Sequence, residues 1–159
     1  MTNSNSESCP EADVVTVAFD GVAERADLEP LIITLVESAA AAEGKTLGPV
    51  AIVITTDAAL QALNAEYRDL DEPTDVLSFD LNDGAEDRIE GDLYISAERA
   101  TVQAREAGLS PDEELIRLVA HGCLHLCGWT HDDDVSLRLM IERGENLISE
   151  LNYRRLIGS

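Results

Sequence analysis

Residues 110–131 read SPDEELIRLVAHGCLHLCGWTH, and this stretch predicts a helix with a marked start and a marked end. Ser110 followed by Glu113 forms a capping box, and Pro111 suits the first helical position because proline lacks the N–H that would go unpaired there. Gly128 can take the left-handed conformation that ends a helix. We therefore expect a helix that begins at Pro111 and ends at Gly128.

The flanking sequence predicts strands and helices in mixed order. Alternating, β-branched runs predict strands at 14–19, 50–55, 76–79 and 92–96. Helical spacing or capping signals predict helices at 28–43, at 56–68 with Thr56 or Asp57 as N-cap, from 96 or 97 to 108, and from 132–134 onward. The acidic segment 81–90 predicts an exposed loop. Because strict βαβ alternation is missing, we expect an α+β fold, a small mixed β-sheet packed with helices.

Length and composition indicate one cytoplasmic domain. The chain has 159 residues, enough for a hydrophobic core. No apolar stretch reaches the roughly 20 residues that a membrane span needs, and the polar N-terminus lacks the pattern of a secretory signal. Three cysteines are too few, and odd in number, for a disulfide scaffold, which fits a reducing cytosol. We expect a disordered extension at 1–12 and a single domain at 13–159.

The chain is strongly acidic. Its 32 aspartates and glutamates face 11 basic residues, of which only Lys45 is a lysine, and the formal net charge is -21. Such a surface should repel polyanions, although strong salt would screen the repulsion. We interpret most of these carboxylates as a solvated surface, of the kind that suits a salty cytoplasm.

All three histidines lie at the end of the helix that begins at Pro111. His121 and His125 are four residues apart and share one helix face, where two imidazoles can reach one ion. Gly128 permits a turn that can return His131 as a third ligand. Three nitrogen ligands leave one position of a zinc ion open for a water that becomes a nucleophile near neutral pH. The spacing is that of a metzincin zinc site and predicts a hydrolase.

Residue 122 argues against a protease. A metalloprotease of this type places a glutamate, its general base, directly after the first histidine, but this chain has Gly122. Cys123 is about 200° around the helix from His121, so it points away from the ion. Cys127 needs an early break of the helix to come near it. We interpret both cysteines as small core residues.

Cleavage of a phosphodiester would call for a cation beside the metal, because negative charge develops on the phosphate. Arg68, at the end of the helix that precedes the strand 76–79, is the candidate, with a role at the helix dipole as the alternative. Arg154 and Arg155 form a small basic spot that fits a solvated helix end better than a phosphate contact.

The chain resembles the bacterial YbeY endoribonucleases, also called ribosomal RNA maturation factors. The shared segments are LNAEYRDLDEPTDVLSF at 63–79, GDLYIS at 91–96 and HGCLHLCGWTH at 121–131, in the family's order. The resemblance implies that His121, His125 and His131 bind one zinc ion, or nickel or another divalent transition metal, and that Arg68 is functionally important. It further implies an endonuclease specific for single-stranded RNA rather than DNA, which matures the 3′ end of small-subunit ribosomal RNA, serves ribosome quality control and works with the small ribosomal subunit.

Two departures from the family pattern stand out. Trp129 and Thr130 replace a common Tyr-Asp pair, which removes an aspartate that could hydrogen-bond beside the metal, and Asp132 or Asp133 could compensate. The acidity is the second departure, because RNA affinity normally draws on cationic surface. A local cationic groove made by the metal and Arg68 must then attract the RNA.

Two other functions stay open. One is a ribosome-assembly binding factor with a structural metal, whose site would close with a fourth protein ligand. The other is a peptidase with a carboxylate supplied from elsewhere. The sequence leaves undetermined the metal, the cleavage site, the oligomeric state and the nucleophile, which is either a metal-bound water or the 2′-hydroxyl of the RNA.

Overall fold

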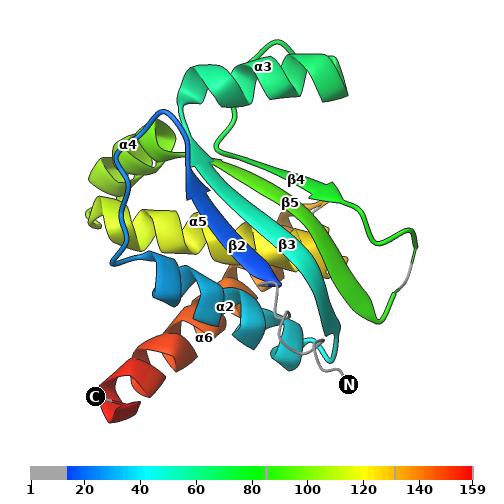
Figure 1. Ribbon diagram of the computed structural model, residues 1–159, viewed down its shortest axis with the longest axis vertical. Coiled ribbons are helices and arrows are strands. Elements are labelled where there is room, and N and C mark those ends of the chain that lie inside the picture. The colour runs from blue at the N-terminus through cyan, green and yellow to red at the C-terminus, as the bar shows by residue number, and fades with distance from the viewer. Residues whose placement is uncertain (1–13, 85, 131, 159) are drawn as a thin grey trace, which may run out of the picture.

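The computed structural model describes residues 14–84, 86–130 and 132–158, and side chains up to residue 151 (Figure 1). The predicted N-terminal extension at 1–12 and His131 lie outside these residues. The strands are β2 (Val15–Phe19), β3 (Thr46–Thr55), β4 (Val76–Asp80) and β5 (Arg88–Ser96). The helices are α2 (Glu29–Ala42), α3 (Asp57–Arg68), α4 (Ala97–Ala107), α5 (Pro111–Leu126) and α6 (Asp134–Gly158).

The four strands form one mixed sheet in the order β2-β3-β5-β4. β2, β3 and β5 run parallel, and β4 pairs with β5 in the antiparallel direction. A parallel neighbour requires a crossover, and α2 supplies it between β2 and β3. β4 is an edge strand and carries part of the site described below. These findings confirm the predicted α+β class and the mixed sheet.

The helices cover the sheet unequally. Figure 1 shows α2, α5 and α6 gathered on one side and α3 on the other. Alternate residues of β3 and β5 point toward α2 and α5 and are almost fully buried, namely Val50, Ile52, Ile54, Ile89, Leu93 and Ile95. Phe79 of β4 contacts Tyr67 of α3, so it faces the opposite side. The main hydrophobic core therefore lies between the sheet and α2 with α5.

Two strands begin earlier than the sequence patterns predict. β3 starts at Thr46, because the register shifts between Leu47 and Val50 and so accommodates Gly48 and Pro49, which interrupt the strand pattern. β5 starts at Arg88, where it pairs with Thr46. The predicted loop at 81–90 was therefore wrong for its last three residues.

The predicted helix caps are confirmed. Thr56 accepts a hydrogen bond from the backbone N–H of Ala59, and Ser110 forms the complete capping box with Glu113. Gly128, just past α5, has φ +103°. These local signals fix the ends of the helices that carry the candidate site residues.

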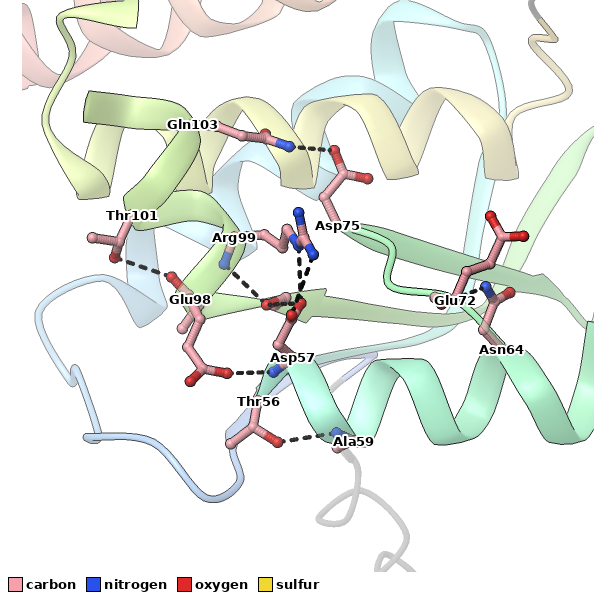
Figure 2. Close-up of polar contacts among 12 residues, drawn as sticks. Thr56, Asp57, Ala59, Asn64, Glu72, Asp75, Glu98, Arg99, Thr101 and Gln103 are labelled. Carbon is pink, nitrogen blue, oxygen red and sulfur yellow. Dashed lines mark hydrogen bonds and ion pairs between the residues drawn. The ribbon is translucent and has the colours of Figure 1, made fainter. Parts of the chain in front are cut away.

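An ion pair joins the starts of α3 and α4 (Figure 2). Asp57 Oδ1 accepts hydrogen bonds from Arg99 Nε at 3.1 Å and from Ser96 Oγ at 3.2 Å. Glu98 accepts the backbone N–H of Asp57 at 2.6 Å. The polar contacts hold both helix starts at the carboxyl ends of β3 and β5.

Among the described residues, no helix has the length and apolar character needed to cross a membrane.

Candidate metal centre

His121 and His125 lie one turn apart on α5, and their rings meet. The ring centroids are 4.7 Å apart with planes at 81°, and the two Nε2 atoms are 3.2 Å apart. Both side chains are partly exposed, although α5 around them is largely buried. The structure thus brings two of the three predicted ligands together, with the Nε2 atoms of the two rings in direct contact.

The end of α5 fixes the orientation of His125. Its Nδ1 lies 3.0 Å from the backbone carbonyl of Trp129, which can only accept, so Nδ1 carries the proton and donates. Trp129 reaches this position because Gly128 takes the left-handed conformation directly after the helix. In the neutral ring this leaves the lone pair on Nε2, the arrangement of a metal ligand whose other nitrogen donates to a carbonyl.

Glu43 in turn holds Trp129. Its carboxylate accepts the indole N–H of Trp129 at 2.9 Å and the Nε–H of Arg143 at 2.7 Å. Desolvation opposes the charged form of Glu43, but the hydrogen bonds from Trp129 and Arg143 outweigh it and hold the pKa of this carboxyl below its ordinary value. Glu43 at the end of α2 therefore connects two other segments, the turn that follows α5 and the helix α6. These contacts support the turn that orients His125.

The donor set fits a zinc-like ion. With Zn–N distances of about 2.05 Å, two nitrogens of a tetrahedral site lie about 3.3 Å apart, and the two Nε2 atoms are 3.2 Å apart. Within the described part of the chain, no group of three histidine, cysteine or acidic side chains stands ready to hold a metal. His131, the third predicted ligand, is outside that part and stays a prediction.

Gly122 seats α5 on the sheet. A Cβ atom at this position would lie 2.9 Å from Cδ2 of Leu93 and 3.3 Å from Cγ2 of Val76. Leu93 is fully buried, so it has little room to retreat. The position that carries the general-base glutamate in a metzincin protease therefore has no room for a side chain, so a peptidase would have to take its carboxylate from elsewhere.

Arg68 is the last residue of α3, and its side chain contacts the edge strand β4. Its Nη2 donates to the backbone carbonyl of Ser78 at 2.7 Å, and its guanidinium lies 5.5 Å from the ring centroid of Phe79. Val76 of the same strand packs toward α5 on the other face of the sheet. Arg68 therefore contacts β4 from the side of α3, whereas the histidine pair lies on α5, which packs on the other face of the sheet.

The partners of Arg68 differ from those of five other arginines. Five arginines form ion pairs with carboxylates, namely Arg25, Arg88, Arg99, Arg117 and Arg143. Arg68 instead contacts a carbonyl oxygen and an aromatic ring. Its positive charge is not neutralised by those contacts, so it is available to an anion.

A cavity of about 190 Å³ opens beside His121, lined also by Asp75 and the buried Glu114. Gln103 donates to Asp75 at 3.1 Å (Figure 2). Desolvation raises the pKa of Glu114 above its ordinary value, although Arg117 at 3.4 Å opposes the shift. No sequence motif predicted this cavity, although Glu114 lies seven residues before His121, a spacing that places both on one helix face.

Both described cysteines are core residues, as predicted. Cys123 is fully buried and Cys127 is 8% exposed. Burial raises the pKa of the Cys127 thiol to about 11 and that of Cys123 further still. Neutral, buried thiols make neither residue a ready metal ligand.

Comparisons with known proteins agree over most of the chain. The family model described as Endoribonuclease YbeY matches residues 19–152. The Endoribonuclease YbeY of Carboxydothermus hydrogenoformans is 38% identical over 136 residues, covering 83% of this chain and 94% of that protein. That of Desulforamulus reducens is 35% identical over 154 residues, covering 89% and 100%. The solution structure of TM1509 from Thermotoga maritima aligns with a TM-score of 0.62 at 27% identity, over 89% of this chain and 92% of that one.

Proposed function

The chain belongs to the YbeY endoribonuclease family, and on that premise we propose that it is a metal-dependent endoribonuclease that cleaves single-stranded RNA. The two Nε2 atoms, 3.2 Å apart, carry this proposal, because their separation matches that of two nitrogen ligands on one zinc ion. The relatives' name supplies the RNA substrate, and the histidine pair supplies the reason for a metal.

We propose that His121, His125 and His131 hold one zinc ion, or nickel or another divalent transition metal in its place. Such an ion supplies Lewis acidity and charge neutralisation at a phosphate. His125 is oriented for this task by its bond to the Trp129 carbonyl, and Glu43 fixes Trp129. The chain would therefore contribute at least one ligand, His125, whose orientation is set by a hydrogen bond within the protein.

Arg68 is the proposed phosphate-binding residue. Cleavage of a phosphodiester concentrates negative charge on the non-bridging oxygens, and a guanidinium stabilises this charge with directed N–H donors. The carbonyl of Ser78 occupies one N–H of Arg68, while the remaining donors of the fork keep their capacity. Because most of the surface is acidic, this local cation also selects where an RNA backbone can approach.

The biological substrate that we propose is the precursor of small-subunit ribosomal RNA, trimmed at its 3′ end in the cytoplasm on the small ribosomal subunit, with a further part in ribosome quality control. This follows from the resemblance of the sequence segments 63–79, 91–96 and 121–131 to the family's markers.

The test is cleavage of a single-stranded RNA that carries the small-subunit 3′ precursor. Wild type is compared with His125→Ala, Arg68→Ala and the control Arg105→Ala, which removes a charge from an exposed position at the end of α4. At matched metal loading, we expect the first two variants to lose at least about 100-fold in rate and the control to keep the wild-type rate. Equal residual cutting in all four proteins would mean contamination and would leave a ribosome-assembly factor.

Product ends decide the nucleophile. Attack by the 2′-hydroxyl breaks the P–O5′ bond and leaves a 2′,3′-cyclic phosphate and a 5′-hydroxyl. Attack by water leaves no cyclic phosphate. Mass spectrometry of the two fragments distinguishes these routes without any change to the protein.

A further inference from the structure

Three aromatic side chains form a continuous row beside Arg68, although the chain has only six aromatic residues. We call Tyr67, Phe79 and Tyr94 the aromatic row. The ring centroids of Tyr67 and Phe79 are 5.7 Å apart at 73°, and those of Phe79 and Tyr94 are 5.9 Å apart at 81°. The row joins α3, β4 and β5 on the face of the sheet opposite α5.

The row runs from the sheet out into solvent. Phe79 and Tyr94 are partly buried, whereas Tyr67 is 63% exposed, the most of any large hydrophobic side chain in the described part of the chain. Burying part of an aromatic ring is favourable, and edge-to-face contacts with Phe79 hold Tyr67 in place. An exposed ring with a fixed inner neighbour offers a rigid surface for another flat group.

A cation lies next to this surface. The guanidinium of Arg68 is 5.5 Å from the centre of the Phe79 ring, and its Nη2 bonds to Ser78 of the same strand. An aromatic side chain beside an arginine is the combination with which proteins bind single-stranded nucleic acid, since the ring takes a base and the cation takes a phosphate. A purely hydrophobic protein partner would not form a favourable contact with the charge of Arg68.

The overall charge favours stacking over counterion release as a source of affinity for RNA. Binding by counterion release needs many cations at the RNA backbone, but this chain carries a net charge of -21. We propose that the aromatic row is a base-stacking subsite for single-stranded RNA, in which Tyr67 stacks on a base of the nucleotide whose phosphate contacts Arg68. This inference rests on the proposed ribonuclease function. It assigns the place on the protein where the RNA substrate is held.

Binding is tested separately from cleavage. Fluorescence anisotropy measures the dissociation constant of 2′-O-methyl oligo(A) and oligo(U), which lack the free 2′-hydroxyl, for wild type, Tyr67→Leu, Tyr67→Trp and the control Leu139→Ala. Leu139 is 52% exposed on α6, so the control also removes exposed apolar surface. Rates on the matching RNA are measured in parallel. In Tyr67→Trp, quenching of the added indole reports stacking once the Trp129 signal of wild type is subtracted.

We expect Tyr67→Leu to bind oligo(A) about 5- to 100-fold more weakly, because stacking on an aromatic ring is lost. Tyr67→Trp and Leu139→Ala should bind like wild type, the indole should be quenched, and oligo(A) should bind more tightly than oligo(U). With one phosphate contact, a sixfold rise in salt should weaken wild-type binding only about 3.5-fold.

Several results would overturn the subsite. These are unchanged binding by Tyr67→Leu, an equal loss in Leu139→Ala, an unquenched indole in Tyr67→Trp, or no binding of oligo(A) by wild type. If wild type cleaves RNA and Tyr67→Leu binds normally, the subsite fails while the ribonuclease stands. If wild type binds with the expected pattern but never cleaves, the subsite stands and the ribonuclease fails.

Discussion

Gly122→Ala tests how closely α5 must approach the sheet. The added Cβ would lie 2.9 Å from Cδ2 and 3.1 Å from Cδ1 of Leu93. Carbon atoms in contact prefer a separation of about 3.5–4.0 Å, so the new methyl group overlaps the leucine by at least about 0.6 Å. Leu93 is fully buried in the core and can retreat only by displacing its neighbours. The substitution therefore adds a methyl group where there is no space.

Two opposing contributions set the change in the free energy of unfolding of Gly122→Ala. Overpacking a well-packed core costs about 1–3 kcal/mol. Replacing glycine by alanine within a helix returns about 1 kcal/mol, because the unfolded chain loses freedom. The net effect is a free energy of unfolding reduced by up to about 2 kcal/mol, which lowers Tm by roughly 2–4 °C for each kcal/mol in a chain of this size.

Gly144→Ala is the matched control, because Gly144 is also buried and helical. Its added Cβ would lie 3.8 Å from Cβ of Ala120 and 3.9 Å from Cδ1 of Leu124, which is ordinary contact. We expect this variant to be more stable than wild type by about 1 kcal/mol. The difference in the free energy of unfolding between the two variants therefore isolates the cost of overpacking. Urea unfolding followed by circular dichroism measures both. Equal stabilisation in the two variants would refute the close seating of α5.

Three further predictions concern the site and its frame. The pKa of Glu43 is below its ordinary value in the folded state, so its contribution to stability is present above the unfolded pKa and is lost as pH falls through the folded one. Glu43→Gln should thus lower the free energy of unfolding by about 1–2 kcal/mol at pH 7, and its difference from wild type should shrink in acid. Urea titrations from pH 7 to pH 3 measure this difference, and a constant value would contradict the prediction. Gly91→Ala would put a Cβ 2.2 Å from the backbone oxygen of Phe79, so we expect a loss above about 3 kcal/mol, and a chemical denaturation midpoint near wild type would disprove the close approach of β4 and β5. Zinc at 100 times its dissociation constant should stabilise wild type by about 2.7 kcal/mol, seen as a higher Tm in scanning fluorimetry; the same shift in His125→Ala would place the ion elsewhere.

Much of the local structure could be read from the sequence because its signals are local. The Ser110–Glu113 capping box, the Thr56 cap and the left-handed Gly128 each depend on residues within one turn of the chain. The i, i+4 spacing of His121 and His125 likewise puts two rings on one helix face before any tertiary contact exists. The sequence alone therefore determined the helix α5, its two ends and the pairing of its histidines.

Tertiary structure decided what depends on residues far apart in the chain. Glu43 supports Trp129 across 86 positions, and Arg68 gains its place only because β4 becomes the edge strand beside β5. The early start of β5 was missed for the same reason, since Arg88 is held in the strand by its pairing with Thr46. The aromatic row draws on three separate elements in the same way. Local propensity acts over a few residues, whereas strand order and packing follow from burying one shared hydrophobic core, so no short motif could have specified these contacts.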